Sequence, residues 1–182
     1  MTSGLWLLVA AGVVVALHLT WTAWTLTRLR RLEARVGRAW TALDAQLQRR
    51  AGLAEELARD HPAALGEGRA ARLAATAAQA RAPLAGDREL AENALGRELR
   101  ELPDGLPGVP TALATDLRGT ATRLGLARRF YNDAVRDTRA LRRRRLSRLL
   151  RLHARRPLPR FFDIDDALDQ AIPEPLAGRG HR

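Results

Sequence analysis

"TALATDLRGTATRLGLARRFYNDAVRDTRAL", residues 111–141, decides the fold of this chain. Apolar or small residues recur along it in steps that alternate between four and three, without a slip. They are Leu113, Leu117, Thr120, Leu124, Ala127, Tyr131, Ala134, Thr138 and Leu141. A mean step of about 3.5 residues is typical of a long helix that packs alongside another long helix. We therefore predict a helix that begins at Thr111 and continues to about Arg155.

A second run with the same spacing precedes it in the chain. Its steps fall on Val36, Trp40, Leu43, Leu47, Arg50, Ala54 and Leu57, so that one step is an arginine. This run predicts a helix from Arg28 to about Arg59. The stretch "DHPAALGEG" (60–68) then ends the helix, because proline and glycine are poor helix residues.

Two shorter helical stretches are predicted at 67–82 and 87–102, with Asp87 as the N-cap of the second. Their apolar faces consist mainly of alanine. The stretch "LPDGLPGVP" (102–110) follows and is predicted to be a loop. Strand-like alternation of any length is absent from the sequence. The predicted fold is therefore all-α: an N-terminal transmembrane helix, then an antiparallel helical bundle with two long helices and a short helical hairpin.

The transmembrane helix is predicted from "LWLLVAAGVVVALHLTWTAW", residues 5–24, which contain no Asp, Glu, Lys or Arg. At ~1.5 Å per residue these residues span ~30 Å, the thickness of the hydrocarbon core of a bilayer. Trp6 lies near one end and Trp21 and Trp24 near the other, where such rings prefer the membrane interface. We place the membrane-spanning helix at 5–27.

Two alternatives compete with an uncleaved anchor. A secretory signal peptide needs a basic first region and a small-residue cleavage site, and neither "MTSG" nor "HLTWTAWTLT" supplies them. The second alternative is a buried core helix of a soluble protein. The basic stretch "RLRRLEAR" directly after the apolar residues favours a membrane-spanning helix instead. Because these arginines crowd the C-terminal flank, the positive-inside rule predicts residues 1–4 outside the cell and the bundle in the cytoplasm, as expected of a single-pass protein of the cell membrane.

An enzyme is the class of protein that the sequence supports least. Cysteine is absent, which excludes thiol catalysis and the common zinc ligand sets, and the four histidines are scattered. The sequence also lacks a glycine-rich phosphate loop and a nucleophile with an assignable base. We therefore predict no catalytic residue, no cofactor and no metal site.

Polar residues at or beside the seam positions of both long helices suggest a polar cluster in the core. Arg50 is on the first seam, with Asp44 and Gln48 near it, and Tyr131 is on the second seam beside Asn132. A buried tyrosine needs a partner for its hydroxyl group. We expect the Tyr-Asn pair to pack and to form hydrogen bonds; a ligand site is the alternative.

Three stretches resemble the LemA family of bacterial membrane proteins. They are "RVGRAWTALDAQLQRRAGLAEELA" (35–58), "LARRFYNDAVRD" (126–137) and the aromatic-acidic "FFDIDD" (161–166). The resemblance implies an N-terminal anchor and a helical bundle, with coiled-coil-like packing, in a protein whose biochemical role is poorly defined.

The chain departs from that family at several positions. Where the family commonly has His-Asp and then Pro-Asn, this sequence has Ala51 and Gly52, then Glu55 and Glu56. A second Tyr-Asn pair of the family is replaced by Thr138 and Arg139. The resemblance thus implies a divergent member.

Basic charge is concentrated in residues 118–160, which hold 15 arginines and only two acidic residues, while the whole chain has a net charge of +11. Within this block Arg144, Arg148, Arg151 and Arg155 form one narrow stripe at helical spacing. A basic amphipathic helix of this kind is typical of a membrane surface, so we expect contact with the bilayer and with anionic lipid headgroups. A solvated or partner-binding face is the alternative, and nucleic acid is the least favoured because aromatic residues do not interleave the arginines.

The predicted organisation is residues 1–4 outside, the anchor at 5–27, the bundle at 28–160, and a tail at 161–182 that is partly disordered. In the tail, Asp163, Asp165 and Asp166 are interpreted as a solvated, Arg-pairing segment in preference to a cation site. The leading hypothesis is a membrane-tethered scaffold or interaction protein that binds a protein partner or itself. The alternative is a membrane-tethered module that binds polyanions through residues 139–160, and a steep salt dependence would distinguish it.

Overall fold

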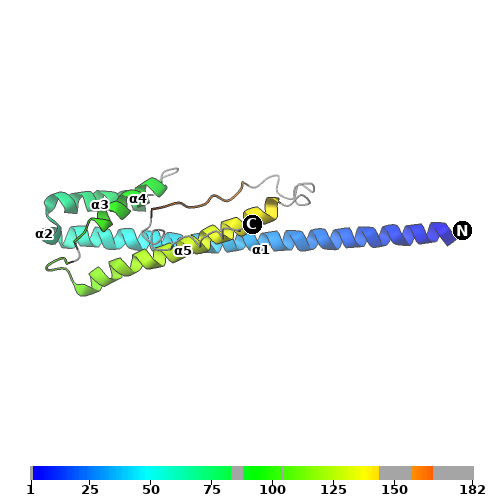
Figure 1. Cartoon of the computed structure of the whole chain (residues 1–182), viewed down its shortest axis with the longest axis horizontal. Coiled ribbons are helices and arrows are strands. Elements are labelled where there is room, and N and C mark those ends of the chain that lie inside the picture. The colour runs from blue at the N-terminus through cyan, green and yellow to red at the C-terminus, as the bar shows by residue number, and fades with distance from the viewer. Residues whose placement is uncertain (1, 83–87, 104, 144–156, 166–182) are drawn as a thin grey trace, which may run out of the picture. The chain divides into compact units, whose positions relative to one another are not determined.

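The computed structural model describes residues 2–82, 88–103, 105–143 and 157–165. Within these residues the chain forms five α-helices and no strand (Figure 1). They are α1 (Thr2–Asp60), α2 (Pro62–Leu65), α3 (Glu67–Arg81), α4 (Arg88–Arg100) and α5 (Thr111–Arg143). The all-helical prediction is confirmed for this part of the chain.

The end of α1, both ends of α3 and α4, and the start of α5 lie within two residues of the predicted positions, whereas the four-residue helix α2 was not predicted. The predicted membrane helix and the first long helix form the single helix α1, which ends at Asp60, and α5 begins at Thr111 as predicted. Asp87, the predicted N-cap, lies outside the described residues. So does the stretch 144–156, where the last helix was predicted to end.

The break after α1 follows from proline and glycine. Pro62 occupies the first turn of the short helix α2, where its missing N–H group costs nothing. Gly66 then adopts a positive φ of 78° and donates its N–H to the carbonyl of Pro62. Because side chains disfavour positive φ, glycine is the residue that suits this reversal into α3.

The chain divides into two compact units. The first unit comprises Met1–Ala39 and Asp133–Arg160, and the second comprises Trp40–Asn132 and Phe161–Arg182. Both long helices therefore contribute one part to each unit.

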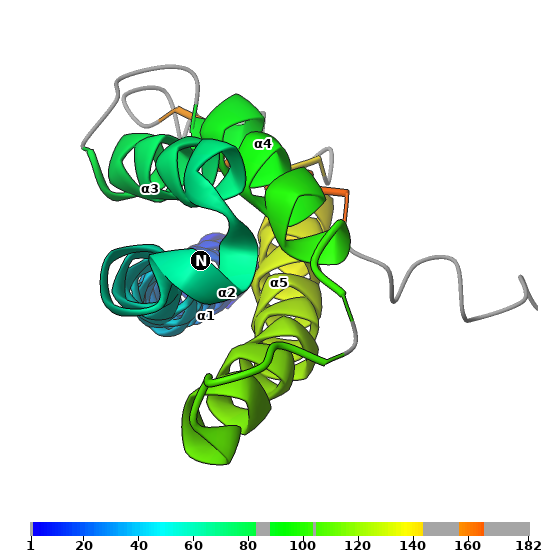
Figure 2. The ribbon, with the colours of Figure 1, turned by 90° about the vertical axis from the view of Figure 1, so that its left-hand side faces the viewer.

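In the second unit, α3 and α4 lie side by side, with α3 over the unit's part of α1 and α4 over its part of α5 (Figure 2). Alanine and leucine make up the core cluster among these helices. Its buried members are Ala51, Ala54, Leu57, Ala58, Leu65, Ala70, Leu73, Ala77, Ala80, Leu95 and Leu113. Alanine lets helix backbones approach closely but buries little area, so most of the buried apolar area must come from the leucines.

The seam positions predicted from the 3.5-residue spacing are buried or half-buried. Leu43, Leu47 and Leu124 are almost completely inaccessible to solvent. Arg50, the charged step of the first seam, is also buried and only 7% exposed. The period therefore identified the inward faces of both long helices.

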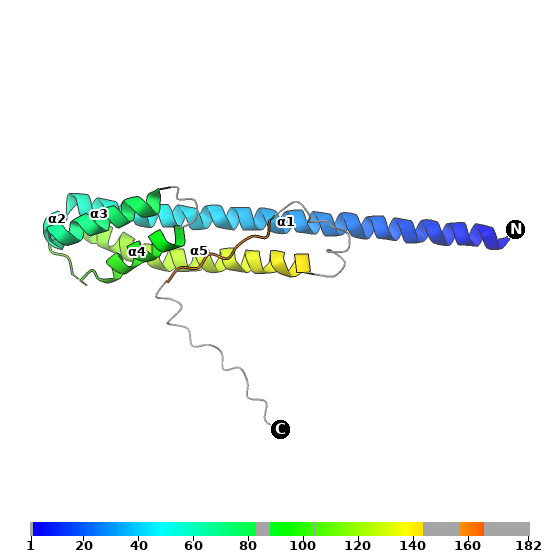
Figure 3. The same cartoon turned by 90° about the horizontal axis from the view of Figure 1, so that it is seen from above.

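The first unit contains the apolar start of α1, and residues 3–20 are all exposed. Among the described residues, α1 is the one helix long and apolar enough to cross a membrane, with a mean hydropathy of 1.9 over its most apolar window and none of that window buried. Further along, the last turns of α5 lie beside α1 (Figure 3). Ion pairs join Glu33 to Arg142 (2.6 Å) and Arg35 to Asp137 (3.0 Å).

Candidate functional site

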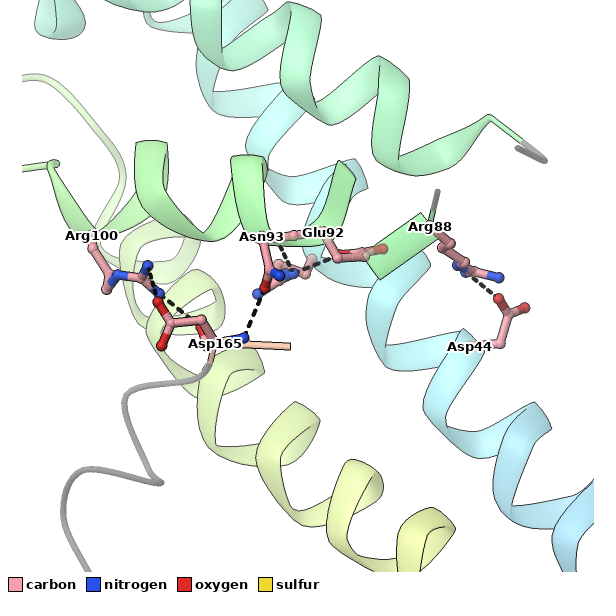
Figure 4. Close-up of polar contacts among 7 residues, drawn as sticks. Asp44, Arg88, Glu92, Asn93, Arg100 and Asp165 are labelled. Atoms are coloured by element: carbon pink, nitrogen blue, oxygen red, sulfur yellow. Dashed lines mark hydrogen bonds and ion pairs between the residues drawn. The ribbon is translucent and has the colours of Figure 1, made fainter. Parts of the chain in front are cut away.

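A buried ion pair joins α1 to α4 in the second unit. Arg50 Nη2 donates a hydrogen bond to Glu92 Oε2 (2.5 Å) and another to the Glu92 carbonyl oxygen (3.1 Å) (Figure 4). The Glu92 side chain is fully buried and that of Arg50 is 9% exposed. An arginine at a seam position loses its hydration on folding, and this cost is tolerable only because an opposite charge faces it.

The pair leaves hydrogen-bonding capacity unused. Among the described residues, Arg50 Nε and Glu92 Oε1 have no hydrogen-bond partner. Burial raises the pKa of Glu92, and the nearby Arg50 guanidinium opposes that shift. The α1–α4 contact therefore holds a buried guanidinium group that can form further hydrogen bonds.

An aromatic cluster surrounds Trp40. Its ring centroid lies 5.3 Å from that of Tyr131 and 5.6 Å from that of Phe162. The Arg88 guanidinium lies over the same ring at 5.6 Å and forms an ion pair with Asp44. Burial raises the pKa of the Tyr131 hydroxyl group. Packing is the role that these contacts give Tyr131.

The extended segment 161–165 lies against the helices of this unit. Asn132 binds the backbone of Phe162 in both directions, because its Nδ2 donates to the carbonyl oxygen and its Oδ1 accepts from the N–H, each at 3.0 Å. The N–H of Asp163 donates to Glu89 Oε1 (2.9 Å), and that of Asp165 donates to Asn93 Oδ1 (2.8 Å). Side chains of α4 and α5 thus satisfy the segment's backbone as a neighbouring strand would.

The side chains of the segment alternate between two environments. Phe162 and Ile164 are buried, whereas Phe161, Asp163 and Asp165 are exposed, as the period of two in an extended chain requires. In the sequence only residues 162–165 alternate between apolar and acidic side chains, and four residues are too few to predict an extended segment. Residues 161–165 of the predicted tail are therefore ordered against the second unit.

Arginines pair with the two exposed aspartates. Arg100 donates to the carbonyl oxygen of Asp165 (2.9 Å) and to its carboxylate (3.1 Å), and Arg128 lies 3.7 Å from the Asp163 carboxylate (Figure 4 shows the first pair). The Arg-pairing interpretation of these aspartates is confirmed for both. Asp166 lies outside the described residues.

Next to this segment is a cavity of about 570 Å³. The end of α4, the loop residues Leu102, Pro103 and Leu106, and the first half of α5 line it. Its apolar lining includes Leu99, Leu102, Leu106 and Leu117, and its charged lining consists of Arg50, Arg100, Arg118 and Asp165. The cavity therefore combines a hydrocarbon wall with an excess of positive charge.

The residues of the predicted polar cluster have separate partners in the described structure. Asp44 pairs with Arg88, Arg50 pairs with Glu92, and Asn132 binds Phe162. Tyr131 packs on Trp40, and Gln48 is half-buried. A single cluster that links Arg50 to Tyr131 or Asn132 stays a hypothesis.

Four of the partners, Arg88, Glu89, Glu92 and Asn93, were not singled out in the sequence. All four belong to the first two turns of α4. Glu89 and Asn93 are four residues apart and therefore share a face of the helix. That spacing was visible in the sequence, but a polar helical face is usually solvated, so it gave no reason to expect a partner.

Of the predicted membrane residues, Trp6 and Trp24 are exposed and Trp21 is half-buried. The Arg28 guanidinium lies 5.4 Å from the ring centroid of Trp24. The predicted basic stripe, Arg144, Arg148, Arg151 and Arg155, lies outside the described residues. In the part of the chain that the structure describes, no group of three or more His, Asp or Glu side chains is placed to hold a metal ion.

Comparisons of the chain with family models, with curated proteins and with solved structures found no match. The resemblance to the LemA family therefore stays a prediction that rests on the three motifs.

We predict that Asn132→Ala loosens the segment 161–165 locally. Loss of the two hydrogen bonds removes about 2 kcal/mol in all, so exchange of the Phe162 amide hydrogen should accelerate about 25-fold. Hydrogen exchange followed by NMR or mass spectrometry measures this. Asp133→Ala is the matched control, since Asp133 pairs with Arg136 at the surface and should leave Phe162 protected. Equal acceleration of Phe162 exchange in both variants would contradict a specific role of Asn132 in holding the segment.

Proposed function

We propose that this protein is a single-pass, membrane-anchored, non-enzymatic interaction protein of LemA type. Residues 5–27 span the cell membrane, residues 1–4 lie outside, and an antiparallel helical bundle in the cytoplasm binds a protein partner or a second copy. The bundle combines the two long helices with the short hairpin of α3 and α4.

The observation that carries this proposal is the exposed apolar start of α1. Residues 3–20 are all exposed, and they include seven large apolar side chains more than 60% exposed: Leu5, Trp6, Leu7, Leu8, Val14, Leu17 and Leu19. Exposure of this much apolar surface to water is unfavourable by about 25 cal/mol per Å², so a lipid environment explains it.

Hydrogen bonding within the same helix supports a lipid environment. The hydroxyl groups of Thr20, Thr22, Thr25 and Thr27 each donate to the carbonyl oxygen four residues earlier, at 2.8–2.9 Å. Polar groups in hydrocarbon must be satisfied within the protein, because water is absent there. These four hydroxyl groups therefore carry no unmet hydrogen-bond demand into the membrane.

An interaction role is supported by apolar side chains on the second unit. Leu126 and Phe130 are four residues apart on α5 and are 47% and 63% exposed. Residues at this spacing are neighbours on a helix surface. Both belong to the motif "LARRFYND", whose Tyr131 and Asn132 face the other way and pack inside, so the motif combines a structural face with a face for a partner.

The membrane topology can be tested with the full chain. A reporter that works only in the cytoplasm should be active when it is fused after Arg182, and a reporter that works only outside the cytoplasm should be inactive there. The protein should also resist extraction from the membrane by alkaline carbonate. Val13→Arg combined with Leu17→Arg should release it, because each arginine costs about 2.5–3.5 kcal/mol near the centre of a membrane helix. Ala45→Arg combined with Glu56→Arg, at exposed positions of the second unit, is the control and should stay in the membrane. Reporter activity only outside the cytoplasm would overturn the orientation.

The interaction role can be tested by photocrosslinking in intact cells. A photoreactive residue in place of Phe130 should give one discrete crosslinked product, either with another protein or with a second copy. The same residue in place of Glu56, which is exposed on α1, is the matched control and should not. If neither position gives a crosslinked product, or if both give the same product, a specific partner face on α5 is contradicted.

A further inference from the structure

The cavity beside α4 has the size and the apolar lining of a small-molecule site. Its volume of about 570 Å³ falls within the range of roughly 300–1,000 Å³ that is common for such sites. Leu99, Leu102, Leu106 and Leu117 give it a hydrocarbon wall. A ligand with an apolar body would remove this wall from water.

Positive charge converges on one turn of α4 in the cavity lining. A Cβ atom built on Gly96 would lie 3.5 Å from Arg100 Nη1 and 3.8 Å from Arg50 Nη1, so both guanidinium groups lie over this glycine. Arg118 and a single carboxylate, that of Asp165, complete the charged lining. The excess of guanidinium groups favours an anion.

Arg50 supplies an independent indication of a ligand. Its side chain is more than nine-tenths buried and lines the cavity, and its Nη1 lies at the Gly96 turn of the lining, while its Nη2 binds Glu92. An anion in the cavity can therefore pair with the Nη1 side of a guanidinium group that burial has deprived of most of its water.

Arg100 shows which kind of anion fits. It already binds a carboxylate in the cavity lining, that of Asp165, at 3.1 Å. The two side chains are 39% and 60% exposed, so the pair contributes little stability and can exchange at little cost. A carboxylate from a ligand can therefore take the place of the Asp165 carboxylate.

We propose that this cavity binds a fatty carboxylate with a single acyl chain. The carboxylate binds Arg100 in place of Asp165, with Arg50 and Arg118 stabilising its charge, and the chain packs against the four leucines. A methylene group occupies about as much space as a water molecule, ~30 Å³, so a chain of about twelve carbons fits. The two long chains of a phospholipid do not.

Binding affects the segment 161–165, because Asp165 is held both by Arg100 and by Asn93. When the ligand displaces its carboxylate, the segment loses its ionic contact at this end. The cavity thus couples the presence of a fatty carboxylate to the loss of one ionic contact of the segment, while its hydrogen bonds to Glu89, Asn93 and Asn132 remain. This inference does not depend on the membrane anchor or on a partner at Phe130.

The test uses the full chain in nanodiscs of phosphatidylcholine and a dodecanoate probe with a diazirine at its methyl end. After illumination, mass spectrometry should find the label in residues 99–124. Unlabelled dodecanoate should compete, whereas dodecanol and a dodecyl-chain phosphatidylcholine should not. Labelling only in the exposed start of α1 would mean partition into lipid and would overturn the proposal.

Two variants of the same ion pair separate direct binding from loss of structure. Arg100→Gln should weaken binding about tenfold, since it removes the main charged donor. Asp165→Asn should strengthen binding about threefold, since it removes the competing carboxylate. Both variants break the same contact to the segment, so effects of equal sign would overturn the proposal. Ala121→Trp, at an exposed position that lines the cavity, should fill the space and abolish specific labelling; labelling that survives it would also overturn the proposal.

Discussion

An arginine in the apolar seam of α1 is the constraint on which the second unit depends. Arg50 occupies a seam position of α1 that an apolar side chain such as leucine would normally fill. Because its charge is buried, it requires an opposite charge beside it, which Glu92 supplies. This requirement sets where α4 lies along α1, because the two side chains have to meet. The positions of Gly96 and Arg100, one and two turns further along α4, follow from it. So does the face of α4 that carries Glu89 and Asn93.

The remaining polar contacts of the unit extend from that arrangement. Glu89 and Asn93 receive the backbone of the segment 161–165, and Asn132 of α5 completes its hydrogen bonding. The aromatic cluster around Trp40 then covers Phe162. Tyr131 and Asn132, the pair that most invites a chemical role in the sequence, here serve to pack a core and to hold an extended segment. Arg50 of the buried pair and Arg100, which binds the segment, both line the cavity together with Arg118.

Local sequence patterns predicted much of the fold, and the reason is physical. Helical periodicity identified the inward residues of α1 and α5, because the spacing repeats over many turns. Leu43 and Leu47 in α1, and Leu124 and Tyr131 in α5, are examples. Proline and glycine indicated where the first long helix ends, because Pro62 and Gly66 act on the backbone of their own turn. Such signals need only a few neighbouring residues.

Partner choice could not be predicted in the same way. Arg50 was recognised as a buried charge, but any of the 20 acidic residues could have faced it, and the choice of Glu92 depends on how α3 and α4 fold back. The segment 161–165 was missed because its contacts come from three distant parts of the chain. The basic stripe at residues 144–155 and the resemblance to the LemA family stay predictions.

A double-mutant cycle on the buried pair tests the central claim most directly, with unfolding of the full chain in detergent by urea as the measurement. Arg50→Leu or Glu92→Leu alone leaves one uncompensated buried charge and should cost about 3–5 kcal/mol of stability. The double variant replaces both charges by apolar groups, so it should regain most of that loss. The account predicts this strong coupling. Additive losses, or single variants as stable as the original chain, would show that Arg50 and Glu92 do not meet in a dry interior and would contradict it.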